Sequence, residues 1–202
     1  MIKEILAVLY GYVSGSLLFS KWLPLMIKNV DVTKDSIDHN PGVANAMKYA
    51  GVKVGLLCLL LDLLKGVVPL YIAIKMGLAK AKLFVLIIVA PVLGHAYSLF
   101  NYFKGGKAIA VSFGVLIGLA FYNYLPLALL ICLYIIGSLI KINPHTKRTR
   151  ITYICFGLGN FLLYLRNNID LAILLGTLMI SLIIIHKNSI RVENQEELES
   201  AN

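Results

Sequence analysis

Long apolar runs separated by short polar connections make up most of this chain. Seven of them come near or exceed the roughly 20 residues with which a helix crosses a bilayer, at about Ile5–Ile27, Gly55–Lys75, Leu83–Phe103, Ile109–Tyr124, Leu125–Ile140, Ile151–Leu165 and Leu171–Ile185. The pattern predicts an all-α integral membrane protein, a single domain over residues 1–190 with a bundle of about seven transmembrane helices. A polar, acidic tail over residues 191–202 is expected to follow it.

Composition supports a membrane protein. Of the 202 residues, 59% are hydrophobic and 14% are charged, whereas soluble domains are about half apolar and about one quarter charged. Three Gly-x-x-x-Gly patterns place small residues one helical turn apart, which predicts close helix packing, at Gly11/Gly15, Gly51/Gly55 and Gly114/Gly118.

The formal net charge of +9 is spread over the connections between the runs. No separate basic domain could carry a nucleic-acid duplex, so nucleic acid is not an expected partner.

The positive charges also predict the orientation in the membrane. With seven spans, one face carries Lys28, Lys34, Lys48, Lys53, Lys104, Lys107, Lys141, Lys147, Arg148, Arg150, Lys187 and Arg191. The other face carries Lys3, Lys75, Lys80, Lys82 and Arg166. The positive-inside rule then predicts an N-terminus outside and a C-terminus in the cytoplasm.

Three polar stretches emerge on the predicted cytoplasmic face, at Asp31–Gly51, His95–Lys107 and His186–Arg191. One site could therefore be assembled from several helix ends. Candidate chemistry is concentrated in these stretches.

The sequence Lys104-Gly105-Gly106-Lys107 precedes the fourth apolar run. Two glycines permit a tight turn with exposed amides, and the next helix would begin with its positive dipole end at the same point, which together suit a phosphate. The alternative is a tight loop between spans with lysines as interfacial anchors. Spacing alone favours neither, and the Walker A spacing is absent.

The stretch from Asp38 to Lys48 begins with a turn marked by Asn40 and Gly42. Asn40 and Asn45 offer neutral donors, and Lys48 offers a charge. On this stretch alone, an ordinary cytoplasmic loop capped by Asx residues is the favoured interpretation.

Ionisable residues inside the apolar runs are few. Asp62 and Lys65 lie three residues apart in the second run, where charges are costly unless paired, so a structural ion pair is the favoured interpretation and a functional role the alternative. His95 and His186 each lie at the end of a run, a common place for interfacial histidines. No group of His, Cys, Asp and Glu has the spacing of metal ligands.

Taken in order, these stretches resemble the PlsY family, small multi-span bacterial acyltransferases that use acyl phosphate. Gly15–Phe19 resembles Gly-Ser-Ile-Pro-Phe without its proline, and Leu61–Gly66 with Pro69 resembles Leu-Asp-x-x-Lys-Gly-x-x-Pro. Gly94-His95 followed by Phe103–Lys107 matches the family's Gly-His and Phe-Lys-Gly-Gly-Lys.

The chain departs from the family pattern in its polar loops. Residues 37–48 represent Gly-Ser-Gly-Asn-x-Gly-Ala-Thr-Asn-x-x-Arg, with Asp38 in place of the serine and Lys48 in place of the arginine. His186 is kept near the C-terminus, but Ser189 replaces the asparagine expected three residues later. A carboxylate repels phosphate and lysine lacks the bidentate fork of arginine.

The resemblance implies transfer of a fatty acyl group from acyl phosphate to glycerol 3-phosphate, giving lysophosphatidate, without a cofactor and in a bacterial cytoplasmic membrane. It implies that Lys104, Gly105, Gly106 and Lys107 hold phosphoryl groups. Asn40, Gly42, Asn45 and Lys48, with Asp38 and Ser189, would form the acceptor site, and His186 would hold or deprotonate the hydroxyl. Two alternatives remain: a divergent relative with another phosphorylated acceptor or no catalysis, and a small anion transporter.

Overall fold

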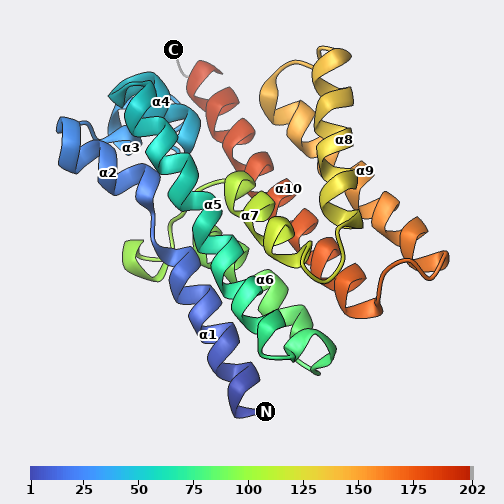
Figure 1. Ribbon diagram of the computed structural model, residues 1–202. Coiled ribbons are helices and arrows are strands. Elements are labelled where there is room, and N and C mark those ends of the chain that lie inside the picture. Colours follow the sequence, from blue (N-terminus) through green and yellow to red (C-terminus); the bar gives the residue numbers. More distant parts are fainter. Residues whose placement is uncertain (201–202) are drawn as a thin grey trace.

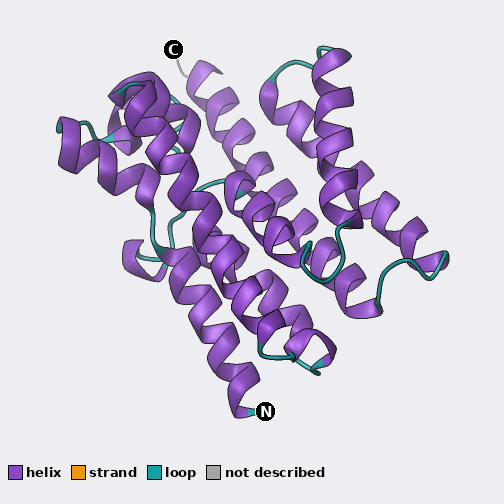
Figure 2. Cartoon of the chain, viewed as in Figure 1, coloured by secondary structure: helices purple, strands orange, loops and turns teal. Residues whose placement is uncertain are grey.

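The computed structural model describes residues 1–200, and side chains up to residue 189. This part of the chain is helical and contains no strand (Figure 2). Its helices are α1 (Ile2–Ser16), α2 (Phe19–Lys28), α3 (Val32–Asp35), α4 (Val43–Ala50), α5 (Val52–Lys75), α6 (Phe84–Ala96), α7 (Ile109–Leu119), α8 (Leu125–Leu139), α9 (His145–Leu165) and α10 (Leu171–Ser200), with 3-10 turns at Leu78–Lys80 and Leu99–Asn101.

The all-α membrane class predicted from the apolar runs is confirmed. Within the described residues, four helical segments are long and apolar enough to cross a bilayer, at Ile2–Lys28, Val52–Lys75, Phe84–Asn101 and Leu171–Ser189, and two apolar helices are shorter, at Ile109–Leu119 and Leu125–Leu139. The count of seven crossings stays a prediction. The N-terminus and the end of α10 lie at opposite ends of the bundle in Figure 1.

The first predicted span consists of two helices rather than one. Helix α1 ends at Ser16, and Leu17 has an extended backbone (φ −71°, ψ 110°) before α2 begins. The break frees the Leu17 carbonyl oxygen, which accepts a hydrogen bond from the Lys65 side chain. It also frees the Ser16 carbonyl oxygen, which accepts one from Ser98 Oγ at 2.6 Å. The apolar pattern runs on through residues 17 and 18, so it could not reveal this break.

The backbone of helix α10 continues through residues 191–200, most of the segment predicted as a polar acidic tail, whose separation from the membrane domain stays a prediction. The acidic segment is therefore an extension of the last helix in its described part.

Glycines from all three Gly-x-x-x-Gly patterns lie in close helix contacts, as the patterns predict, and Gly55 of the Gly51/Gly55 pattern packs against Met47 of α4. A Cβ placed at Gly15 would overlap the Pro91 carbonyl oxygen, and one at Gly114 would overlap the Leu63 carbonyl oxygen. Gly51 is different, since nothing lies within 4 Å of such a Cβ and its φ of +92° is the feature that requires glycine. It joins α4 to α5.

Replacing Gly114 with alanine is expected to loosen the contact between α5 and α7. The added methyl meets a backbone oxygen, which cannot rotate away, so overpacking should cost about 1–3 kcal/mol of unfolding free energy. Gly137→Ala is the matched control, because its Cβ would lie 3.4 Å from Arg148 Cγ, in nearly ordinary contact. Thermal unfolding in detergent measures both, and equal melting temperatures would contradict the assigned packing.

Candidate functional site

A cavity of about 560 Å³ lies among the loop before α4, helices α4 to α6, and the first turns of α7 and α9. Polar and apolar side chains both line it. The polar ones include Asp38, Asn40, Asn45, Asp62, His95, Lys107, His145 and Thr146, and the apolar ones include Val43, Met47, Leu59, Ile109 and Phe113. Such a lining suits an amphiphilic molecule with a charged head and an apolar chain.

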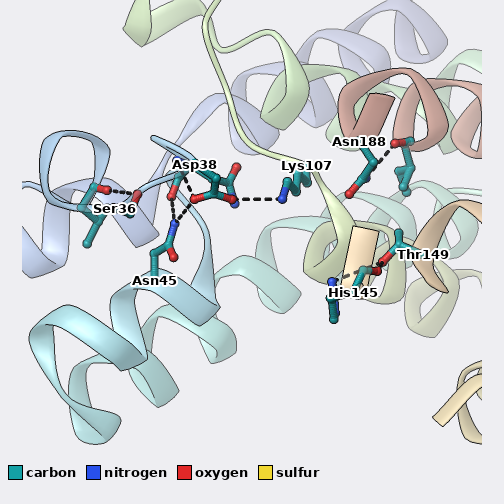
Figure 3. A network of polar contacts seen from close by, with 10 residues as sticks. Ser36, Asp38, Asn45, Lys107, His145, Thr149 and Asn188 are labelled. Carbon is teal, nitrogen blue, oxygen red and sulfur yellow. Dashed lines mark hydrogen bonds and ion pairs between the residues drawn. The ribbon is translucent and has the colours of Figure 1, made fainter. Parts of the chain in front are cut away.

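An ion pair joins two of the predicted polar stretches inside this cavity. Lys107 Nζ lies 3.0 Å from Asp38 Oδ2, and their side chains are only 13% and 21% exposed. The other carboxylate oxygen, Asp38 Oδ1, accepts a hydrogen bond from Asn45 Nδ2 at 2.7 Å (Figure 3). The Asp38 carboxylate is thus paired with the Lys107 ammonium, the positive charge that the sequence analysis assigns to a phosphoryl group.

The turn around Asn40 is held by its own side chains. Asn45 Nδ2 donates to the Asn40 carbonyl oxygen at 2.8 Å. Gly42 leaves room for the Asn40 side chain, because a Cβ there would overlap Asn40 Nδ2. Asn40 Oδ1 is buried and has no hydrogen-bond partner among the described residues. A buried acceptor of this kind in a cavity wall calls for a ligand donor or water.

The two glycines of the Lys104–Lys107 turn pack against His95. A Cβ at Gly105 would overlap the His95 carbonyl oxygen, and one at Gly106 would overlap His95 Nε2. The Gly106 N–H donates to the His95 carbonyl oxygen at 3.1 Å. The expectation of an exposed Gly106 amide is therefore wrong, because that donor is used within the fold.

The first turn of α7 brings further backbone amides to the cavity. Ala108 (φ 59°) turns the chain into the helix, and Ala108, Ile109 and Ala110 line the cavity beside Lys107. The first N–H groups of a helix have no intrahelical acceptor and carry the positive dipole end. An anion beside Lys107 would contact these N–H groups and lie at the positive end of the helix dipole.

His145, Thr149 and Asn188 lie on the opposite side of Lys107 from Asp38 in Figure 3. Thr149 Oγ1 donates to the His145 carbonyl oxygen at 3.0 Å. Asn188 is fully buried, and its Nδ2 donates to the Ile184 carbonyl oxygen at 2.8 Å. The sequence prediction missed His145 and Thr146 as lining residues. Pro144 at the N-cap, followed by two polar residues, marks a helix start that could have indicated them.

The pKa of His145 lies below its ordinary value of 6.5, because the ring is partly withdrawn from water and because Arg148 and Lys107 oppose another positive charge. The unfolded chain therefore binds a proton at His145 before the folded protein does. Stability should fall as pH drops through 6.5. His145→Gln is expected to reduce that fall, measured as the melting temperature between about pH 7.5 and about pH 5; identical pH profiles would contradict the assignment.

Seven predicted site residues are absent from the cavity lining. Gly105 and Gly106 are buried against His95, and Lys65 is buried beside Asp62. Lys48, Lys104 and His186 are exposed, and Ser189 Oγ donates to the Ile185 carbonyl oxygen at 3.0 Å. Helix α10 thus places Asn188, one residue before Ser189, toward the bundle interior.

The predicted pair of Asp62 and Lys65 forms, and both side chains are almost fully buried. Lys65 Nζ lies 2.8 Å from Asp62 Oδ1, and Ser20 Oγ donates to Asp62 Oδ2 at 2.6 Å. Lys65 Nζ also lies 2.8 Å from His95 Nδ1. The pair therefore extends to the histidine that packs against the Gly105-Gly106 turn.

Comparison with known proteins relates this arrangement to a family. A family profile described as glycerol-3-phosphate acyltransferase matches residues 5–194. The glycerol-3-phosphate acyltransferase of Hydrogenobaculum sp. (strain Y04AAS1) is 31% identical over 192 residues, covering 93% of this chain and 92% of the relative. Glycerol-3-phosphate acyltransferase 2 of Thermotoga maritima is 42% identical over 106 residues. In that alignment the chain spans about half the length of the relative, 53%.

Solved structures share the fold. A crystal structure of PlsY (YgiH), an integral membrane glycerol 3-phosphate acyltransferase in its glycerol 3-phosphate form, is similar with a TM-score of 0.79 and 25% identity, covering 98% of this chain and 93% of that one. The lysophosphatidic acid form of PlsY gives a TM-score of 0.74 at 24% identity.

Proposed function

Because this chain belongs to the glycerol-3-phosphate acyltransferase family, we propose that it transfers a fatty acyl group from acyl phosphate to glycerol 3-phosphate in phospholipid biosynthesis. The observation that carries the proposal is the cavity itself. It combines Lys107, the first turn of α7 and Asn40 Oδ1, an acceptor without a partner among the described side chains, with apolar walls. A phosphoryl head and an acyl chain could therefore be bound together.

The proposed step is a direct transfer. The primary hydroxyl oxygen of the acceptor attacks the acyl carbonyl carbon, and the bond from that carbon to the phosphate oxygen breaks. Inorganic phosphate leaves and takes the hydroxyl proton, so no acyl-enzyme is required. Lys107 and the start of α7 would stabilise the charge that develops on the phosphate, and the cavity walls would orient the two substrates.

Asn40 and Asn45 are proposed to orient the acceptor from the turn before and within α4. Apolar side chains such as Met47 and Phe113 would contact the acyl chain. Lys48, Lys104, His186 and Ser189 lie outside the lining, and we assign them no contact with the reacting groups in this arrangement.

The proposed location is a bacterial cytoplasmic membrane with the site on the cytoplasmic side. The distribution of lysine and arginine over the connections supports this orientation. It agrees with soluble glycerol 3-phosphate reaching the cavity from the cytoplasm.

Purified protein reconstituted in liposomes tests the activity. With acyl phosphate and labelled glycerol 3-phosphate, we expect labelled lysophosphatidate. Uptake of labelled glycerol 3-phosphate without chemical conversion would instead support the anion transporter.

One observation favours a second candidate, a related acyltransferase with a different acceptor. The Asp38 carboxylate holds Lys107 at 3.0 Å, and it disfavours a second anion at the same point. If folded protein converts no glycerol 3-phosphate, other phosphorylated acceptors are the compounds to test next.

A further inference from the structure

The connection between α8 and α9, with the first turns of α9, carries four basic side chains and no acidic one. They are Lys141, Lys147, Arg148 and Arg150, and we call them the α8–α9 basic cluster. The sequence contains no Asp or Glu between Asp62 and Asp170. The ion pairs among the described residues all lie elsewhere. Within that part of the chain, no ion pair balances the positive charge of the cluster.

Arg148 is the member of the cluster that packs against the neighbouring helix. A Cβ placed at Gly137 of α8 would lie 3.4 Å from Arg148 Cγ and 3.6 Å from its Cδ, so the aliphatic part of the side chain crosses α8 where glycine leaves room. Arg148 is half-buried, whereas the other three members are exposed. Its side chain therefore loses less conformational freedom on binding a ligand than an exposed lysine does.

The guanidinium of Arg148 lacks an acceptor. Its Nε is buried and has no hydrogen-bond partner among the described residues. A guanidinium has five N–H donors and no acceptor, and leaving such donors unpaired in a buried place is costly. Because the side chain is only half-buried, an anion can reach the guanidinium from the surface. Arginine is also the side chain best suited to bind a phosphate through two hydrogen bonds.

The position of Arg148 suits the phosphate group of a membrane lipid. Helix α8 ends at Leu139, and the apolar run of α9 begins at Ile151, three residues after Arg148. The guanidinium therefore lies near the level at which the apolar spans end. Ile136, Ile140 and Ile151 are exposed beside it along the two helices, where lipid chains would cover them.

The leaflet is the one in which anionic lipids are expected. In Figure 1 the α8–α9 connection lies at the same end of the bundle as the end of α10, the predicted cytoplasmic end. Anionic lipids give the cytoplasmic leaflet a negative surface potential, and basic pockets between transmembrane helices on that side bind their head groups.

We propose that the α8–α9 basic cluster binds the phosphate group of an anionic phospholipid of the bilayer, with Arg148 as the anchoring contact and Ile136, Ile140 and Ile151 beside the acyl chains. This lipid site is separate from the proposed reaction cavity. His145 and Thr146 of α9 line that cavity, whereas Arg148 does not. The lipid site therefore does not depend on which acceptor the protein acylates.

Native mass spectrometry of the full chain released from lipid nanodiscs tests this binding without turnover. The nanodiscs contain equal amounts of phosphatidylglycerol, which is anionic, and phosphatidylcholine, which has a phosphate but no net charge. We expect the wild-type protein to retain phosphatidylglycerol in preference to phosphatidylcholine by about tenfold or more. Equal retention of the two lipids would overturn the proposal. Displacement of the lipid by added inorganic phosphate would also overturn it, because the cluster would then bind a free phosphate.

Arg148→Gln tests whether Arg148 is the anchor, since it removes the charge and keeps part of the stem that packs on Gly137. Arg166→Gln is the matched control, because Arg166 is an exposed arginine at the other end of the same helix. We expect Arg148→Gln to lower phosphatidylglycerol retention by about tenfold and Arg166→Gln to match wild type. Equal retention in the two variants would refute Arg148 as the anchor.

Arg148→Lys provides a second variant, because lysine keeps the charge but lacks the planar fork of arginine. It should retain more phosphatidylglycerol than Arg148→Gln and less than wild type, and the reverse order would contradict the proposal. Melting temperatures identify variants that fail to fold. If neither Arg148 variant folds, the lipid preference of the wild-type protein decides alone. Because no substrate is present, a negative result leaves the proposed acyl transfer untouched, and a catalytically inactive protein would still be expected to retain the lipid.

Discussion

Lys107→Ala is expected to reduce acyl transfer by a factor of about 100 to 1,000, the usual effect of removing one donor to a developing oxyanion. Lys107 is the charged side chain at the start of α7 and is mostly shielded from water. Its loss removes a full positive charge from the proposed position of the leaving phosphate. The measurement is the initial rate of lysophosphatidate formation in lipid.

Lys104→Ala is the matched control, since Lys104 belongs to the same turn but is exposed and lies outside the cavity lining. It should keep most of the wild-type rate. Melting temperatures must be recorded for both, because Lys107→Ala also removes the ion pair between Lys107 and Asp38. A folded Lys107→Ala protein with nearly wild-type activity would remove Lys107 from the mechanism.

Asp38→Ser is expected to lower the KM for the substrate whose phosphate binds at Lys107, by about tenfold or more. The carboxylate repels phosphate and neutralises Lys107, whereas a serine hydroxyl donates, and hydrogen bonds to charged groups contribute about 1.5–3 kcal/mol. Steady-state kinetics with acyl phosphate and glycerol 3-phosphate varied in turn will show which substrate responds.

Asp35→Ser provides the control for a change of net charge, because Asp35 is exposed on the same segment. It should leave both KM values unchanged. If Asp38→Ser loses activity while remaining folded, Asp38 holds Asn45 and Lys107 in their working positions instead of competing with phosphate. A gain of activity with glycerol 3-phosphate from an inactive wild type would support the altered-acceptor candidate.

The helical bundle could be predicted from the sequence because apolar runs of bilayer length have few alternatives to helix. The break at Leu17 could not, since it depends on Lys65 and Ser98, residues far along the chain that bind the freed carbonyl groups. The helix break at Leu17 is therefore stabilised by tertiary contacts, which a local sequence pattern does not show.

The candidate site could be predicted where its residues belong to local sequence motifs. The stretches containing Asn40, Asn45 and Lys107 meet in one cavity, as their shared predicted face suggested. The role of Gly106 was mistaken because the pattern shows a flexible residue but not the His95 ring that packs against it. His145 was overlooked because no pattern connects the start of α9 with Lys107.

The stoichiometry of the reaction tests the central claim most directly. Wild-type protein in lipid is given acyl phosphate and glycerol 3-phosphate, and lysophosphatidate and inorganic phosphate are measured in the same sample. Direct transfer predicts equal amounts of the two products and no acylated protein by mass spectrometry. Phosphate released without lysophosphatidate, or an acyl group retained on the protein, would contradict direct transfer in this cavity.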